Sequence, residues 1–236
     1  KYKDLLEENR KLRENITYLK KYDQVTNLYN REAFCASAEE IMRQNPQTRF
    51  EIICIDIERF KLVNELYGRE QGDLLLKYVS GQLKCMIREG KSIAGNLRDD
   101  VFALCVPAED ESSTVNQILG IFSEKPMDAQ AVPAVGIYRT EGEEPAVGNM
   151  CDRALMALNS IKGNDHHVAV YREGMREKLL REQEITNSMA AGIKNREFKI
   201  YMQPKCNMES GKVVGAEVLV RWQHPEKGLL LPGDFV

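Results

Sequence analysis

The chain has 236 residues, a formal net charge of −3 and 43% hydrophobic residues. This length fits one large domain or two smaller ones, and the hydrophobic content excludes general disorder. The chain is mildly acidic and so lacks the net positive charge that is typical of nucleic-acid-binding domains. We find no apolar run that could cross a bilayer and no secretory signal. None of the six cysteines forms a C-x-x-C pair, so we expect a reducing, cytoplasmic compartment. Whether a longer parent protein is anchored in a membrane stays open.

Residues 1–22 predict a charged signalling helix with a coiled-coil seam. Two rows of residues spaced by seven run along it: Leu5, Leu12 and Leu19, and beside them Tyr2, Asn9 and Ile16. An Asn in such a seam can fix register and a two-stranded state. We therefore expect a homodimer through this helix. An amphipathic helix that packs on its own domain is the alternative.

Residues 23–172 are predicted to form one α/β (α+β) domain. The expected elements are a helix at 31–42, a strand at 50–57, helices at 61–67 and 72–86, strands at 92–97 and 101–106, a helix at 113–122, a strand at 134–138, a helix at 147–161 and a strand at 167–171. This order suits a central sheet flanked by helices, with the hairpin of the second and third strands at the functional site.

The remainder of the chain predicts a helical linker and the start of another domain. Residues 173–196 are charged and helical, and two strands at 198–203 and 212–222 flank a turn at 209–211. The chain ends shortly afterwards, so we expect 197–236 to be a truncated domain whose strands expose their edges.

Carboxylates supply the chemical signal in the first domain. Asp56 lies near the end of a buried strand, and Asp99 and Asp100 form the tip of the hairpin. Carboxylates from adjacent strand ends can hold Mg²⁺, which prefers oxygen ligands. A solvated acidic turn is the alternative that these residues alone leave open.

Several motifs, in order and in register, resemble the GGDEF family of diguanylate cyclases. Residues 23–34, DQVTNLYNREAF, are similar to D-x-L-T-G-L-x-N-R-x-x-F, and residues 56–68, DIERFKLVNELYG, to D-x-D-x-F-K-x-x-N-D-x-x-G. Gly72-Asp73 follows at the family spacing, and residues 98–102, RDDVF, stand where the name-giving motif belongs. The resemblance implies a nucleotidyl-cyclase-like fold. Two such domains each bind GTP with Mg²⁺ or Mn²⁺ and meet to form cyclic di-GMP.

The resemblance also assigns roles to individual residues. Asp56, the backbone of Ile57 and Asp100 would hold the metal. Asn64 and Asp73 would hydrogen-bond the guanine. Because these positions are retained, GTP binding without turnover stays open.

The hairpin departs from the family motif at three of its five positions. Arg98 and Asp99 replace two glycines that let the backbone turn and approach phosphates closely. Val101 replaces the second acid, while Asp100 and Phe102 match. We expect metal binding to be weak or absent and no residue of 98–102 to be catalytically functional.

The phosphate side and the regulatory site depart as well. Asn159 occupies the position of a family Lys, and Lys162-Gly163-Asn164-Asp165 replaces G-R-N, with Lys162 as a partial substitute. The product-inhibition motif R-x-x-D reads Glu89-Gly90-Lys91-Ser92, so we expect that site to be missing.

The C-terminal strands resemble the start of an EAL domain, the cyclic di-GMP phosphodiesterase built on a TIM-like barrel. Glu217-Val218-Leu219 stands for E-A-L. The resemblance implies that Glu217 holds metal and that Gln203 and Arg221 contact cyclic di-GMP. Residues 197–236 are far fewer than the roughly 250 of a TIM barrel, so this part should not hydrolyse the dinucleotide by itself.

Three functional hypotheses follow. The first is an inactive GGDEF domain that acts as the regulatory and dimerisation module of a GGDEF-EAL protein whose complete EAL domain hydrolyses cyclic di-GMP. The second is a non-enzymatic scaffold or GTP-sensing interaction module. The third, an active diguanylate cyclase, has the least support.

Overall fold

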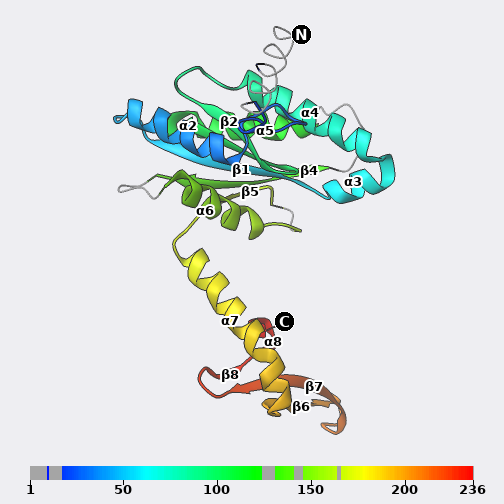
Figure 1. The fold of residues 1–236 in the computed structure, drawn as a ribbon. Coiled ribbons are helices and arrows are strands. Elements are labelled where there is room, and N and C mark those ends of the chain that lie inside the picture. The colour runs from blue at the N-terminus through cyan, green and yellow to red at the C-terminus, as the bar shows by residue number, and fades with distance from the viewer. Residues whose placement is uncertain (1–9, 11–17, 124–130, 141–145, 164–165, 236) are drawn as a thin grey trace. The chain divides into compact units, whose positions relative to one another are not determined.

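A computed structural model describes residues 10, 18–123, 131–140, 146–163 and 166–235 (Figure 1). The predicted coiled-coil helix over 1–22 therefore lies largely outside the described residues. The chain divides into two compact units, residues 1–172 and residues 173–236.

Unit 1 is built on a five-stranded sheet with the order β2-β3-β1-β4-β5. The strands are β1 (Phe50–Glu58), β2 (Ile93–Arg98), β3 (Val101–Pro107), β4 (Val132–Arg139) and β5 (Val168–Val170). β1 pairs antiparallel with both β3 and β4, and β5 joins β4 in parallel. The predicted α/β class with a central sheet is confirmed.

Helices cover both faces of this sheet (Figure 1). They are α2 (Arg31–Gln44), α3 (Phe60–Tyr67), α4 (Arg69–Cys85), the short η1 (Ala108–Asp110), α5 (Glu111–Ser123) and α6 (Val147–Asn159). α2 and α6 contribute to one hydrophobic cluster, and α4 and α5 to the other.

The alternation of β1 explains why most of the strand is apolar, apart from Glu51, Asp56 and Glu58. Ile53, Ile55 and Ile57 belong to the cluster of α4 and α5, whereas Ile52 and Cys54 belong to the cluster of α2 and α6. Successive side chains of a strand point to opposite faces, and here both faces are buried. A central strand covered on both sides needs no polar face, even in an antiparallel setting.

The segment before α2 is anchored to β2. The backbone N–H of Asn96 donates to the Tyr29 carbonyl at 2.8 Å, and the Tyr29 ring stacks on Tyr22 with centroids 5.0 Å apart. Asn30 caps α2, because its side-chain oxygen accepts from the Ala33 N–H at 3.0 Å. The family-like stretch at 23–34 thus connects the N-terminal part of the chain to the edge strand of the sheet.

α4 begins earlier than the sequence predicts. The helix starts at Arg69 rather than Gly72, directly after Gly68, whose φ is +84°. Gly72 therefore lies inside the helix, where glycine is usually unfavourable. A Cβ there would lie 1.9 Å from Asn64 Oδ1, so a side chain at this position would displace the Asn64 carboxamide.

Unit 2 consists of a long helix and a small antiparallel sheet with the order β6-β7-β8. Its elements are α7 (Gly174–Lys194), β6 (Phe198–Cys206), β7 (Val213–His224), β8 (Gly228–Leu230) and α8 (Pro232–Phe235). β6 extends through Pro204, beyond the predicted end at Gln203. Proline is tolerated there because β6 is an edge strand.

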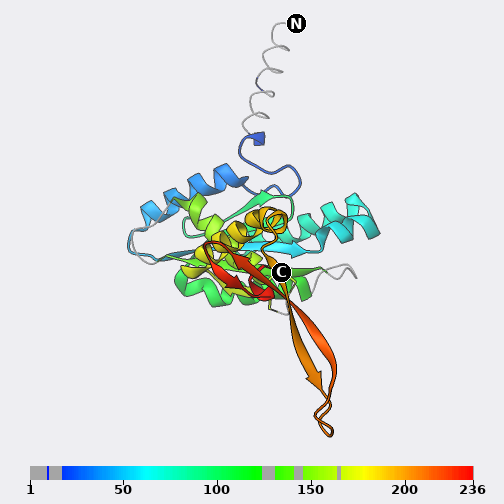
Figure 2. The same cartoon turned by 90° about the horizontal axis from the view of Figure 1, so that it is seen from below.

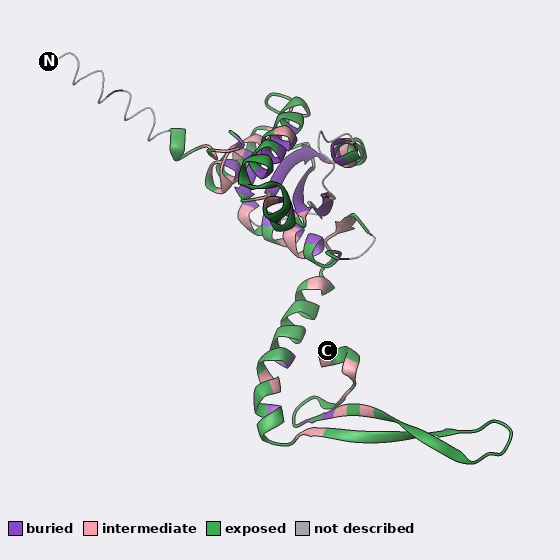
Figure 3. Cartoon of the chain, turned by 90° about the vertical axis from the view of Figure 1, so that its right-hand side faces the viewer, coloured by how far each residue is buried: buried purple, intermediate pink, exposed green. Residues whose placement is uncertain are grey.

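Trp222 is the centre of a small apolar cluster in unit 2. The indole is fully buried, stacks on Phe198 with centroids 4.7 Å apart and meets the edge of Phe235 at 5.8 Å. Its Nε1–H donates to Glu197 Oε2 at 2.9 Å. Away from this cluster the β6–β7 hairpin is long, twisted and exposed (Figures 2 and 3).

No helix in the described parts of the chain is both long enough and apolar enough to span a membrane.

Candidate functional site

The end of β1 carries two carboxylates toward α6. Asp56 and Glu58 share the strand face of Cys54, which packs in the cluster of α2 and α6. Lys162 follows the end of α6, and its Nζ lies 2.6 Å from Asp56 Oδ2. The backbone N–H of Gly163 donates to Glu58 Oε1 at 3.2 Å. Two adjacent contacts therefore hold the segment after α6 against the end of β1.

The Asp56–Lys162 contact is partly shielded from solvent. The side chain of Asp56 is 10% exposed and that of Lys162 is 39% exposed. A charge-assisted hydrogen bond of this length is stronger than a neutral one, and a carboxylate this buried needs a partner. Lys162 supplies it from a position that is 106 residues distant in the sequence.

The hairpin turn keeps a glycine-like backbone although its glycines are replaced. Asp99 and Asp100 form the two-residue loop between β2 and β3, and Asp99 has φ +38°. Asn96 Nδ2 donates to the Asp99 carbonyl at 2.9 Å, and the Ile57 N–H donates to the Asp100 carbonyl at 3.3 Å. Asp is among the few residues that tolerate the left-handed region, so the turn forms without glycine.

A pair of substitutions tests this turn. Asp99→Val should unfold at lower urea than Asp99→Gly, with a difference of about 1–2 kcal/mol in the free energy of unfolding, because a β-branched side chain is strained at positive φ. Glycine has no such strain. Equal midpoints for the two variants would show that residue 99 does not need the left-handed conformation.

The surroundings of Asp100 raise its pKa to about 6. Burial is the largest cause, because it disfavours the charged carboxylate, and the nearby charge of Asp56 adds to it, whereas the Lys162 ammonium opposes both. Val101, the next residue, is buried and stands opposite Asp56 in the β1–β3 register. An isopropyl group therefore occupies the place where the family motif has its second acid.

These residues do not fit a divalent metal well. Mg²⁺ and Mn²⁺ prefer several oxygen ligands, and in the described part of the chain no three or more His, Cys, Asp or Glu side chains gather as a metal site. Of the two carboxylates that the resemblance assigns to the metal, Asp56 and Asp100, the first already binds the Lys162 ammonium.

The two residues predicted to bind guanine lie on the α3–α4 pair. Asn64 on α3 packs its carboxamide against Gly72 of α4, and Asp73 is exposed one residue further along α4. Their proximity in the fold is consistent with one shared ligand. Their role toward a nucleotide stays a prediction.

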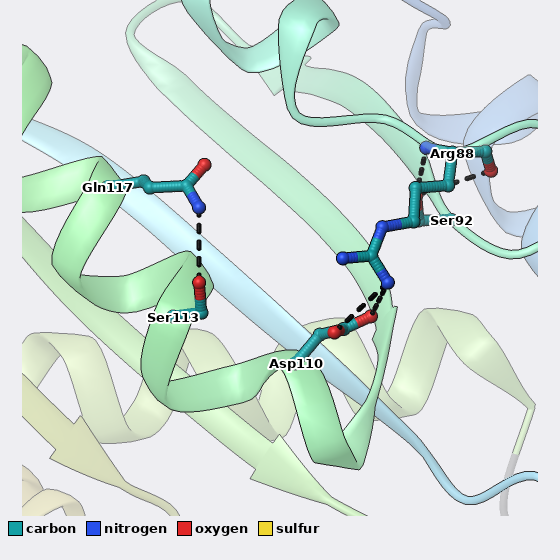
Figure 4. A network of polar contacts seen from close by, with 5 residues as sticks. All are labelled: Arg88, Ser92, Asp110, Ser113 and Gln117. Carbon is teal, nitrogen blue, oxygen red and sulfur yellow. Dashed lines mark hydrogen bonds and ion pairs between the residues drawn. The ribbon is translucent and has the colours of Figure 1, made fainter.

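The turn before β2 stands where the family has its product-inhibition motif R-x-x-D. In this chain contacts among Arg88, Ser92 and Asp110 hold the turn (Figure 4). Arg88 pairs with Asp110, its Nη1 lying 2.9 Å from Oδ2 and 3.2 Å from Oδ1. The Arg88 N–H also donates to Ser92 Oγ at 2.6 Å. Arg88 thus ties this turn to η1.

In unit 2 the three residues predicted to contact metal and cyclic di-GMP share one face of the sheet. Gln203 stands directly opposite Glu217, and Arg221 lies four residues along the same strand. Lys205 Nζ lies 3.2 Å from Glu217 Oε2, and both side chains are more than half exposed. The Arg221 Nη1 donates to the Val220 carbonyl at 2.8 Å.

Sequence reasoning missed the partner of Lys162 and one buried carboxyl group. Glu51 on β1 is 5% exposed and lies beside Glu111 and Arg139. The apolar residues that follow Glu51 predict a buried strand, and its alternation with Ile53 and Ile55 places it on the α5 face. The two neighbours come from elsewhere in the chain and cannot be read from this pattern.

The fold is a mixed α/β domain of the GGDEF type with a central sheet and helices, followed in the chain by a small additional sheet. Residues 20–166 match the family described as "Diguanylate cyclase, GGDEF domain", and residues 185–236 match the EAL domain. The first match covers more than half of the chain, so the chain belongs to the GGDEF family.

Among known proteins, the bifunctional diguanylate cyclase/cyclic di-GMP phosphodiesterase MucR of Pseudomonas aeruginosa is 26% identical over 225 residues, which are 91% of this chain and 33% of MucR. The coiled coil and GGDEF domain of DgcB from Caulobacter crescentus superimposes with a TM-score of 0.60 at 21% identity, covering 72% of this chain and 95% of that one. The S helix-GGDEF-EAL part of Vibrio cholerae LapD superimposes with a TM-score of 0.60 at 16% identity, covering 100% of this chain and 56% of that one. The chain spans about a third of the length of the curated relatives it matches.

Proposed function

We propose that this chain is the regulatory GGDEF part of a cyclic di-GMP signalling protein and does not itself synthesise the dinucleotide. The observation that carries the proposal is the 2.6 Å contact between Lys162 and Asp56, with Val101 opposite Asp56. Phosphoryl transfer relies on positioning and on neutralisation of charge at the phosphates. Lys162 occupies Asp56, the carboxylate expected to hold the metal, and the apolar Val101 replaces the second acid. Neither requirement, the positioning of the phosphates or the neutralisation of their charge, is then met.

The EAL match supports the second half of the proposal. A longer chain with a complete EAL domain would hydrolyse cyclic di-GMP, and the GGDEF domain would regulate that reaction. Glu217 keeps the acid of the E-A-L motif, and Gln203 and Arg221 stand on its face of the sheet. A dimer through the N-terminal helix would bring two such chains together.

The test is to incubate the chain with GTP and with either Mg²⁺ or Mn²⁺ and to analyse the products by chromatography, beside an active diguanylate cyclase. We expect no cyclic di-GMP. Formation of cyclic di-GMP would refute the proposal.

The alternative is a GTP-sensing interaction module without any enzymatic partner. The retention of Asn64 and Asp73 on neighbouring helices favours GTP binding. Calorimetry with GTP on the same samples tests this alternative: heat of binding that Asn64→Ala removes supports the GTP-sensing module, and the absence of any heat of binding removes it.

A further inference from the structure

Lys162 lies where the resemblance places a metal ion. Its ammonium group contacts Asp56 Oδ2 at 2.6 Å, and it lies close enough to Asp100 to act on that carboxyl electrostatically. The two carboxyl groups repel each other, and a cation between them relieves that repulsion. A bound metal would meet the same requirement.

The backbone holds Lys162 in this position. α6 packs on β4 at Gly136, where a Cβ would lie 2.0 Å from the Ala154 carbonyl oxygen, so helix and sheet approach closely. Ile161 is buried, and the Gly163 N–H donates to Glu58. Residues on both sides of Lys162 are therefore fixed, and its side chain reaches Asp56 without a long flexible loop.

We propose that Lys162 serves as a built-in cation that replaces the divalent metal at Asp56, so that this GGDEF domain keeps its site neutralised without a metal. The inference deepens the proposed function and rests on it in one respect, the loss of metal-dependent turnover at this site. It predicts that the site becomes receptive to metal when the ammonium is removed.

The experiment is a titration of the whole chain with Mn²⁺ alone, followed by calorimetry and by the shift in melting temperature. Lys162→Met should bind Mn²⁺ roughly ten- to hundredfold more tightly than the natural chain, since a hydrogen bond between charged groups that competes with the metal is removed. Mn²⁺ should also raise the melting temperature of Lys162→Met while leaving that of the natural chain unchanged.

Three further variants keep the inference falsifiable. Lys162→Gln retains a donor for Asp56 and should still gain Mn²⁺ affinity even if the Met variant folds poorly. Lys162→Arg keeps the positive charge and should behave like the natural chain. Lys84→Met is the matched control. Lys84 lies on α4, and its Nζ donates to the Thr26 carbonyl at 3.2 Å rather than to a carboxylate. This variant should leave Mn²⁺ binding unchanged.

Equal Mn²⁺ affinity of the natural chain, Lys162→Met and Lys162→Gln would overturn the inference. So would a gain of affinity in Lys84→Met as large as in Lys162→Met. These outcomes are separate from the product assay: cyclic di-GMP formation refutes the proposed function, whereas the Mn²⁺ titration needs no nucleotide and tests the role of Lys162 by itself.

Discussion

Gly136→Ala is expected to destabilise unit 1 by about 3 kcal/mol, because the added methyl group overpacks a contact between backbone segments. The ideal Cβ position lies 2.0 Å from the Ala154 carbonyl oxygen and 2.7 Å from both Leu158 Cβ and Leu158 N. Neither the strand nor the helix backbone can yield locally, so α6 must move away from β4. Urea unfolding followed by circular dichroism measures the loss.

Gly120→Ala is the matched control for this prediction. Gly120 lies within α5, and a Cβ there would meet nothing within 4 Å. The helix preference of alanine should raise stability by about 0.5–1 kcal/mol. If the two variants unfolded at the same urea concentration, the close approach of α6 to β4 would be wrong. The anchoring of Lys162 over Asp56 would then lose its structural basis.

Glu51→Gln is expected to flatten the pH dependence of stability in the neutral range. Arg139 lies 2.7 Å and 2.8 Å from the two Glu111 oxygens but 3.6 Å from Glu51 Oε1. The pKa of Glu111 is therefore lowered, whereas burial and the hydrogen bond with Glu111 raise the pKa of Glu51 to about 8. We therefore expect Glu51 to be the protonated member of the pair.

The sign of the effect follows from linkage. An unfolded Glu51 releases its proton near its ordinary pKa of 4.5, whereas the folded protein keeps it up to about 8. Between these values the folded state binds more protons, so stability falls as pH rises. We expect this group to cost the natural chain roughly 1–3 kcal/mol between about pH 5 and pH 8, an amount reduced from the full shift because the pair is coupled.

The measurement is urea unfolding of the natural chain and of Glu51→Gln at a series of pH values. The variant should match the natural chain at the acidic end and exceed it at the basic end, since glutamine keeps a donor for Glu111 and never ionises. Glu109→Gln, an exposed residue of η1, is the control and should follow the natural curve. Parallel curves for Glu51→Gln and the natural chain would show that Glu51 is ionised in the fold.

In the C-terminal unit the sequence predicts the strands but not the packing around them. The sequence predicts two strands around a turn, whereas their register, in which Gln203 stands opposite Glu217, comes from the structure. The burial of Trp222 beneath Phe198 and Phe235 depends on α8, a short helix that no periodic pattern predicts. Short elements have too few residues to show a period, and their position depends on what they cover.

The order of helices and strands in unit 1 and its family motifs were determined by the sequence alone, because apolar periodicity and motif spacing are local properties of the chain. The mixed α/β fold followed from them. The cation at Asp56 was decided by the tertiary structure, because the contact joins residues 106 positions apart and depends on the close packing of α6 on β4. The raised pKa of Glu51 also depends on the tertiary structure. Burial and two neighbours from other elements, Glu111 and Arg139, set this pKa, and neither the burial nor the neighbours can be read from the sequence of β1.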